Sequence, residues 1–349
     1  MTDLLPGLSL QHVEAPRLRT AVISDGKADG DVVLLVHGNV SSSLFWQETL
    51  LALPEGFRGL APDLRGFGAS ETKPVDATRG LRDFSDDLAS LLDTLGIARA
   101  HVVGWSMGGG VVSQLLLDRP DLVASVTLVN PVSPYGFGAT KGLDGERTSD
   151  DDAGAGGGGA NPDFVAAIQA GDTGDGSPNS PRNVMNGFYF ADGFRAPLED
   201  VYVESMLTTA TGEDNYPGDL VASESWPGFG AGSRGVLNTM APKHHNVSGI
   251  VDLADKPPFL WVRGAKDQIV ADESLFDLAT LGKLGAIPGW PGEDVAPPQP
   301  MVAQTRAVLD RYAAAGGRYT EVVLDAGHSP LVERPAEFQA ALAEHLRSA

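Results

Sequence analysis

Gly104-Trp105-Ser106-Met107-Gly108 joins two segments of opposite character. Before Ser106, residues 100–105 begin with the apolar run Ala-His-Val-Val, which is typical of a strand. After it, residues 109–117 carry apolar side chains at helical spacing. The sequence therefore predicts a strand, a tight turn and a helix, with Ser106 in the turn. The flanking glycines allow neighbouring backbone to approach this turn closely.

A serine exposed on such a turn is a candidate nucleophile. Its hydroxyl is weak at neutral pH and needs an imidazole to take its proton, and the imidazole needs a carboxylate to orient it. Asp267 follows an expected strand at 258–262, and His328 follows another at 320–324. We expect Ser106 as nucleophile, His328 as general base and acid, and Asp267 as the orienting carboxylate, in the chain order that such a turn requires.

Rival residues fit these roles less well. Asp272 lies further from its strand end than Asp267, and it is the nearest alternative carboxylate. Five other histidines are less suitable as the base. His12 and His345 lie near the termini, where we expect contact with solvent. His101 begins a strand, and His244 and His245 lie in a polar stretch.

Two backbone amides are candidates for stabilising a tetrahedral oxyanion. One belongs to Met107, the residue after the nucleophile. The apolar strand 31–36 ends in His37-Gly38-Asn39, and the backbone N–H of Asn39 is the second candidate. We expect His37 to brace this loop rather than to act as a base.

Together these motifs resemble the α/β-hydrolase superfamily, in particular its serine esterases and lactonases. A further match is the segment 63–70, Asp-Leu-Arg-Gly-Phe-Gly-Ala-Ser, and the likeness covers about residues 15–131 and 256–349. The resemblance implies an α/β fold, with a mostly parallel central sheet flanked by helices and an inserted cap. It implies core segments 1–130 and 257–349, a cap at 131–256, and a smaller insertion at 269–302.

The expected cap changes in composition and is rich in Gly, Asp, Asn, Ser and Pro. We expect helices at 162–169 and 198–208. The glycine-rich run 154–160 should be an exposed loop of low local stability. The segment is also rich in aromatic residues, which disordered segments lack. We expect Trp105 and cap aromatics to line an apolar substrate pocket over Ser106 (Phe188, Tyr189, Phe190, Trp226).

Serine at the nucleophile position restricts the chemistry. Haloalkane dehalogenases and epoxide hydrolases share the early motifs but use aspartate, because a serine ether could not be hydrolysed. An acyl carbon is therefore expected, and a carboxylic ester or lactone fits best. Cofactor-free perhydrolases or haloperoxidases, and C–C or amide hydrolases, could use the same groups. A ligand receptor built on a hydrolase scaffold is an alternative from another class.

Composition limits the partners further. The net charge of −21 disfavours nucleic acid and anionic membranes, so a small-molecule ester or lactone is the expected partner. There are no cysteines, which excludes disulfides and thiolate metal sites, and we expect neither a cofactor nor a metal. Residues 1–7 lack the features of a signal peptide, which favours the cytoplasm. Oligomeric state stays open, as does whether the acidity reflects salt adaptation.

Overall fold

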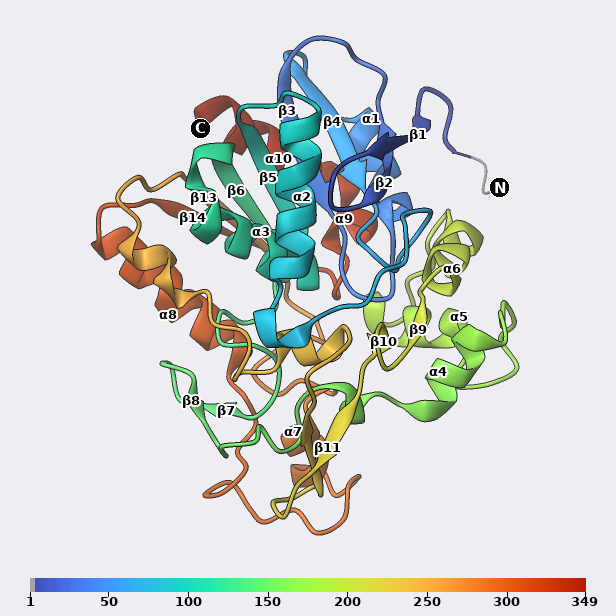
Figure 1. Ribbon diagram of the computed structural model, residues 1–349, viewed down its shortest axis with the longest axis vertical. Coiled ribbons are helices and arrows are strands. Elements are labelled where there is room, and N and C mark those ends of the chain that lie inside the picture. The colour runs from blue at the N-terminus through green and yellow to red at the C-terminus, as the bar shows by residue number, and fades with distance from the viewer. Residues whose placement is uncertain (1–3) are drawn as a thin grey trace.

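Eight strands form one central sheet in the computed structural model, which describes residues 4–349 (Figure 1). The expected core segment 1–130 and the stretch 1–7 both begin outside these residues. The strand order is β1-β2-β4-β3-β5-β6-β13-β14, with β1 and β2 antiparallel to their neighbours and the others parallel. The mostly parallel α/β fold is therefore confirmed. The strands are β1 (Ser9–Glu14), β2 (Arg19–Ser24), β3 (Asp31–Val36), β4 (Phe57–Pro62), β5 (Ala100–Trp105), β6 (Val123–Val129), β13 (Phe259–Gly264) and β14 (Tyr319–Leu324).

Helices cover both faces of the sheet. Figure 1 shows α2 (Arg82–Thr94) in front of the strands and α10 (Pro335–Ser348) behind them. Helix α3 (Met107–Asp118) packs on β5 and α2, while α1 (Gln47–Leu51) contacts α10. The remaining core helices are α8 (Met301–Ala314) and the short α9 (Pro330–Glu333). Every residue of β5 is buried, as a central parallel strand covered on both faces requires.

A long segment separates β6 from β13. Within the described residues, it contributes no strand to the central sheet. Figure 1 places most of its elements below the lower ends of β5 and β6. The division into core and cap remains a prediction. The segment contains α4 (Pro162–Gln169), α5 (Pro181–Val184), a π-helix (Met185–Tyr189), α6 (Glu199–Leu207), and the strand pairs β7 (Thr140–Lys141) with β8 (Glu146–Arg147), β9 (Thr211–Gly212) with β10 (Tyr216–Pro217), and β11 (Leu220–Ala222) with β12 (Phe229–Ala231).

The glycine-rich run 154–160 is not the exposed loop that the sequence predicted. Gly157 is buried in a short 3₁₀ helix, Gly157–Gly159, and its N–H donates to Asn238 Oδ1 over 3.0 Å. A Cβ on Gly157 would lie 2.5 Å from the carbonyl oxygen of Asp219. Glycine is required here by close packing, which is the reason the predicted exposed loop is not found at Gly157.

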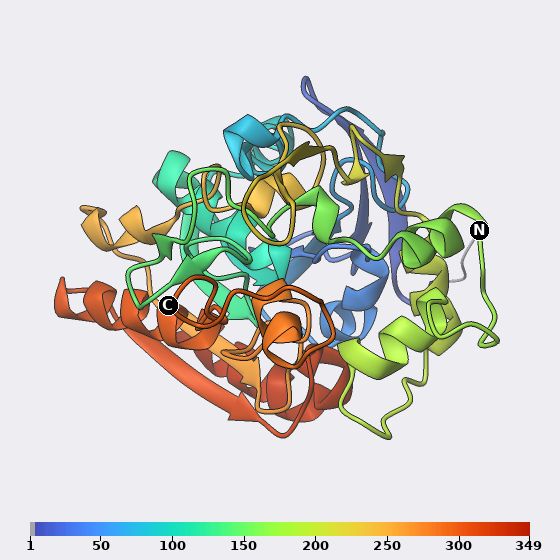
Figure 2. The ribbon, with the colours of Figure 1, turned by 90° about the horizontal axis from the view of Figure 1, so that it is seen from below.

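The second insertion lies against the cap. Helix α7 (Leu278–Lys283) appears beside β11 in Figure 1, and the view from below in Figure 2 places the orange segment that contains it in front of the sheet. Trp226 of the cap donates from Nε1 to the Pro288 carbonyl over 2.9 Å. The two insertions are thus joined. Among residues 4–349, no helix combines the length and the apolar character that crossing a bilayer requires.

Candidate active site

Ser106 stands in a strained turn between β5 and α3. Its backbone has φ 57° and ψ −121°, a left-handed conformation that is uncommon outside glycine. Its N–H donates to the Val129 carbonyl over 2.9 Å. A Cβ on Gly108 would collide with the carbonyls of Val36 and His37, so glycine is needed for α3 to approach β3. The predicted strand, turn and helix are all present.

His328 and Asp267 form a buried pair. Nδ1 of His328 lies 2.9 Å from Oδ2 of Asp267, and their side chains are only 2% and 3% exposed. The second carboxylate oxygen of Asp267 accepts from the N–H groups of Ile269, over 2.8 Å, and Val270, over 3.2 Å. With Oδ1 held by backbone, Oδ2 is free to orient the imidazole and fix which nitrogen carries the proton.

The histidine loop, which contains His328, is tied directly to the turn at Ser106. Trp105, which precedes Ser106, donates from Nε1 to the His328 carbonyl over 2.8 Å. Ser106 and His328 line the same cavity, and no hydrogen bond joins their side chains within the described residues. Such hydrogen bonds are often long in ligand-free enzymes and shorten when substrate binds. The three residues predicted from separate parts of the chain are therefore brought together.

Asp272, the rival carboxylate, has a different task. Its Oδ1 accepts from the N–H groups of Val302 and Ala303, over 2.9 and 3.0 Å, and so caps the first turn of α8. The prediction that His345 is solvated was wrong, because it is 8% exposed and lies on the buried face of α10. His12 is exposed and pairs with the Ala69 carbonyl.

The loop after β3 is braced by the side chains of His37 and Ser41. His37 Nδ1 and the Ser41 hydroxyl both bind the Gly38 carbonyl, over 2.7 and 2.9 Å, while His37 Nε2 accepts from the Leu64 N–H. Burial lowers the pKa of His37, which favours this neutral, bracing form. In a trans peptide the N–H points opposite to the C=O. The Asn39 N–H therefore points away from His37.

The two amides proposed for the oxyanion hole are unoccupied by other groups. Asn39 and Met107 both line the cavity. Met107 is the first residue of α3, so its N–H has no acceptor within the helix. The Asn39 N–H has no hydrogen-bond partner among residues 4–349, and the same is true of its buried side-chain Oδ1.

Two polar residues that sequence reasoning missed fix the histidine loop. Asn130, just after β6, donates from Nδ2 to the Gly327 carbonyl over 3.0 Å and accepts from the Gly264 N–H over 2.9 Å. Glu333 accepts from the Gly327 N–H over 2.8 Å. No local sequence pattern identifies either residue. The partners of Asn130 are backbone groups far away in the sequence, and the partner of Glu333 lies in the preceding loop.

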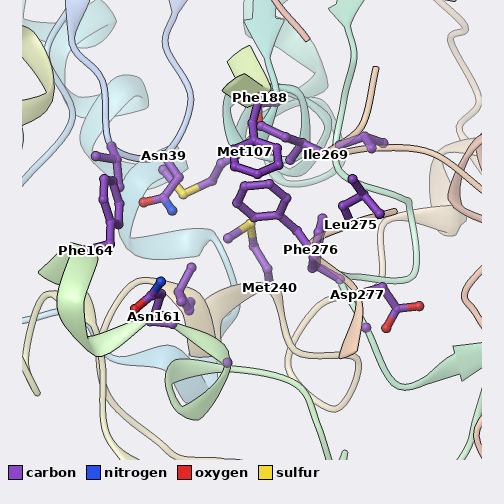
Figure 3. Close-up of a pocket in the computed structure, with 18 of the residues that line it drawn as sticks. Asn39, Met107, Asn161, Phe164, Phe188, Met240, Ile269, Leu275, Phe276 and Asp277 are labelled. Atoms are coloured by element: carbon purple, nitrogen blue, oxygen red, sulfur yellow. The ribbon is translucent and has the colours of Figure 1, made fainter. Parts of the chain in front are cut away.

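The cavity over Ser106 has a volume of about 520 Å³ and mostly apolar walls. Figure 3 shows the rings of Phe188, from the cap, and Phe276, from the second insertion, next to each other, and they meet edge to face. Their centroids lie 5.1 Å apart. Other walls come from the core, cap and second insertion (Trp105, Phe137, Phe164, Tyr189, Met240, Ile269, Leu275).

Two predicted pocket residues lie elsewhere. Phe190 is 1% exposed and packs against Phe194 inside the cap. Trp226 packs on the second insertion through its bond to Pro288, outside the cavity wall. Both were expected from their aromatic character alone, which identifies a buried or packed residue without indicating which surface it meets. Phe188, Tyr189 and Trp105 do line the cavity.

Charge in the cavity wall is sparse. No lysine or arginine from the described residues lines it. Asp277 does, but its carboxylate accepts from the N–H groups of Ala279 and Gln299, over 3.2 and 2.8 Å, and burial raises its pKa. Among residues 4–349, no three acidic or histidine side chains gather as ligands for a metal ion. The wall is thus suited to neutral, apolar molecules.

Comparison with known sequences gives local matches. The sequence model of the family described as "alpha/beta hydrolase fold" matches residues 31–150. A putative carbamate hydrolase RutD from Variovorax paradoxus (strain S110) is 45% identical over 106 residues, which are 30% of this chain and 40% of that protein. Carboxylesterase YbfK from Bacillus subtilis (strain 168) is 29% identical over 117 residues, 34% of this chain and 39% of that protein. The chain spans about a third to two fifths of the curated relatives it matches.

Solved structures resemble the chain along nearly its whole length. A hydrolase from Pseudomonas aeruginosa PA01 aligns with a TM-score of 0.60 at 20% identity, covering 97% of this chain and 98% of that one. The enol-lactonase from Burkholderia xenovorans LB400 aligns with a TM-score of 0.58 at 21% identity, covering 97% and 100%. At this identity the likeness concerns the fold.

Proposed function

The chain belongs to the α/β-hydrolase superfamily, and we propose that it is a serine hydrolase that cleaves a neutral carboxylic ester or lactone through an acyl-enzyme on Ser106. The observation that carries the proposal is the buried His328–Asp267 pair, 2.9 Å apart, in the wall of the cavity that also contains Ser106. Burying the Asp267 carboxylate costs desolvation free energy, and a catalytic role would explain why the fold retains it.

The chemistry follows in two halves. His328 Nε2 takes the proton of Ser106 while the serine oxygen bonds to the acyl carbon. The tetrahedral intermediate then collapses, its bond to the alcohol oxygen breaks, and His328 returns the proton to that oxygen. Water attacks the acyl-enzyme with His328 again as base, and the Ser106 oxygen leaves with the proton. For a lactone the alcohol stays attached to the acyl product.

Stabilisation of the oxyanion is the second requirement. Within residues 4–349 the N–H groups of Asn39 and Met107 have no acceptor, and both residues border the cavity. Donors fixed before the reaction stabilise developing charge without reorganising. His37 and Ser41 supply that rigidity on one side of the Asn39 amide by holding the preceding carbonyl.

The substrate class follows from the cavity wall. Aromatic and aliphatic side chains dominate it, and no described cation is available to bind an anionic group. The net charge of −21 further disfavours anionic substrates. We therefore propose uncharged esters with aromatic or medium-length aliphatic acyl groups.

A phosphonate that mimics such an ester tests the proposal. We expect wild-type protein to turn over p-nitrophenyl hexanoate repeatedly, and a p-nitrophenyl phosphonate to label Ser106 stoichiometrically, as read by peptide mass spectrometry. Ser106→Ala should lose at least about 10³-fold in kcat/KM while keeping its melting temperature. Labelling at another residue, or a single slow turnover without release of free protein, would contradict a serine hydrolase. The second outcome would favour a ligand receptor.

Other acyl chemistries can be compared in the same assay. A carbamate and a lactone should be tested beside the hexanoate ester, because relatives named for these groups share part of the sequence or the fold. Peracid formation can be measured by adding peroxide with the ester. We expect the ester or lactone to have the highest kcat/KM.

A further inference from the structure

One cap side chain reaches the loop that carries the Asn39 amide. The hydroxyl of Tyr189 lies 3.2 Å from the Asn39 carbonyl oxygen and 3.2 Å from the Val40 carbonyl oxygen. Since carbonyls only accept, the phenol is the donor. These two carbonyls belong to the peptide groups on either side of the Val40 α-carbon. Tyr189 therefore bridges the two peptide groups that flank Val40.

Val40 is a residue whose conformation needs such support. Its φ of 45° is a genuine outlier for a β-branched side chain. A strained backbone of this kind persists only where the surroundings hold it in place. His37 and Ser41 hold the Gly38 carbonyl from the core, one residue before the Asn39 carbonyl. Tyr189 supplies the hydrogen bonds at the strained residue itself.

Tyr189 is in turn firmly fixed. Its ring packs edge-on against Trp105 at 5.8 Å and His328 at 6.1 Å. Two residues later, the Ala191 N–H donates to Glu333 Oε2 over 2.7 Å, which ties this part of the cap to the histidine loop. Burial raises the pKa of Tyr189 well above its usual range, so the hydroxyl remains a donor at any working pH.

We propose that Tyr189 is a positioning residue whose hydroxyl holds Asn39 and Val40 in the conformation that points the Asn39 N–H at the oxyanion. The inference rests on the proposed acyl-transfer function. It gives the cap a part in the chemistry, because the oxyanion hole is then braced by the core on one side and by the cap on the other. An interaction of this kind stabilises the transition state more than the bound ester.

Deletion of the hydroxyl alone tests the proposal. We expect Tyr189→Phe to lower kcat about tenfold, with KM within about twofold. This loss is smaller than the roughly 10²–10³-fold that follows removal of an oxyanion donor, because here the donor stays and only its orientation loosens. The matched control is Tyr202→Phe. Tyr202 is a second buried cap tyrosine, stacked on Phe45 at 4.2 Å and outside the cavity wall, and its variant should keep wild-type kcat.

A pair of ketones separates oxyanion binding from general loosening of the cap. A phenylalkyl trifluoromethyl ketone adds to Ser106 and places an oxyanion in the hole, whereas the matching methyl ketone binds without one. Tyr189→Phe should weaken the trifluoromethyl ketone about tenfold and leave the methyl ketone within twofold. Equal weakening of both, or unchanged kcat, would overturn the inference.

The same measurements keep the two proposals apart. Failure of the trifluoromethyl ketone to attach to Ser106 in the wild-type protein would overturn the proposed function, and this inference with it. The other outcome is that the wild-type protein is active and binds the trifluoromethyl ketone through Ser106, while Tyr189→Phe changes neither kcat nor ketone affinity. That outcome would overturn only the positioning role of Tyr189.

Discussion

Three non-glycine residues around the site have positive φ: Ser106 at 57°, Val40 at 45° and Asn130 at 39°. Each costs on the order of 1–3 kcal/mol, so the surroundings must stabilise all three. Asn130 does so by its own side chain, which joins Gly264 to the histidine loop. In the proposed mechanism, strain concentrated in this way keeps the reacting groups in place before substrate arrives. Substitutions among the residues that hold them should therefore affect rate more than binding.

Asp267→Asn should lower kcat by about 10³–10⁴-fold with little change in KM, because an amide stabilises the wrong imidazole tautomer. Steady-state kinetics on the hexanoate ester measures this. Asp272→Asn is the matched control, since it makes the same change in the capping carboxylate of α8. It should cost at most about 1 kcal/mol of stability and leave kcat nearly unchanged. A crippled Asp272→Asn with a mild Asp267→Asn would show that the carboxylate was misassigned.

Asn39→Ala should cost less than about tenfold in kcat, because the proposed donor is the backbone N–H, which alanine retains. The buried, unpartnered Oδ1 of Asn39 makes this variant informative. A loss of about 10²–10³-fold at unchanged melting temperature would identify the side-chain amide as the donor. Measurement of kcat alongside thermal unfolding distinguishes the two.

At the scale of elements, the glycine-rich 3₁₀ helix Gly157–Gly159 is part of the cavity wall rather than a loose connection. Gly156 and Gly159 line the cavity, and Gly157 contacts the backbone at Gly218 and Asp219 so closely that no side chain fits. Gly157→Ala should therefore destabilise the protein by about 1–3 kcal/mol through overpacking. KM should rise as the wall shifts. Denaturant unfolding and kinetics measure the two effects.

Gly187→Ala is the matched control for that substitution. Gly187 lies in the cap π-helix, and a Cβ there would meet nothing within 4 Å. Alanine is favoured over glycine in helices by about 1 kcal/mol, so this variant should be neutral or slightly stabilising. If Gly157→Ala proved equally neutral, the run would be a loop that tolerates side chains, as the sequence first suggested.

At the scale of the whole molecule, four buried histidines should make the free energy of unfolding depend on pH. Burial lowers the pKa of His37 and His101, and it lowers those of His245 and His345 to about 4. In the unfolded chain each takes a proton near pH 6.5. Between about pH 6.5 and 4 the unfolded state therefore binds more protons, and the free energy of unfolding falls as pH decreases. Glu333 and Asp277, whose pKa values burial raises, offset part of this fall.

The urea midpoint should thus decrease steadily from pH 7 to pH 4.5. His245→Gln should reduce the slope, because His245 is 1% exposed and neither ring nitrogen has a partner among residues 4–349. A midpoint that is constant over this range would mean that the buried imidazoles are protonated in the native state.

Much of the core was predictable because its signals are local. Apolar runs and the glycines of the Ser106 turn predicted β3 and β5 at their observed bounds, and helical spacing predicted α4. Ser106, Asp267 and His328 each follow a strand of a parallel sheet, and the carboxyl ends of such strands meet at one edge. Their proximity could therefore be expected from the order of elements alone, although their catalytic roles remain proposals.

The sequence by itself determined the main strands, the turn at Ser106 and the positions of Asp267 and His328 after strand ends, because hydrophobic period and turn chemistry act over a few residues. Only the tertiary structure decided that Tyr189 touches the Asn39 loop, that Trp226 lies outside the cavity, and that Gly157 of the glycine run is buried. Those outcomes depend on which distant surfaces meet, and aromatic or glycine content carries no information about the partner. Residues 131–256, which form short strands and short helices, owe their arrangement to such contacts.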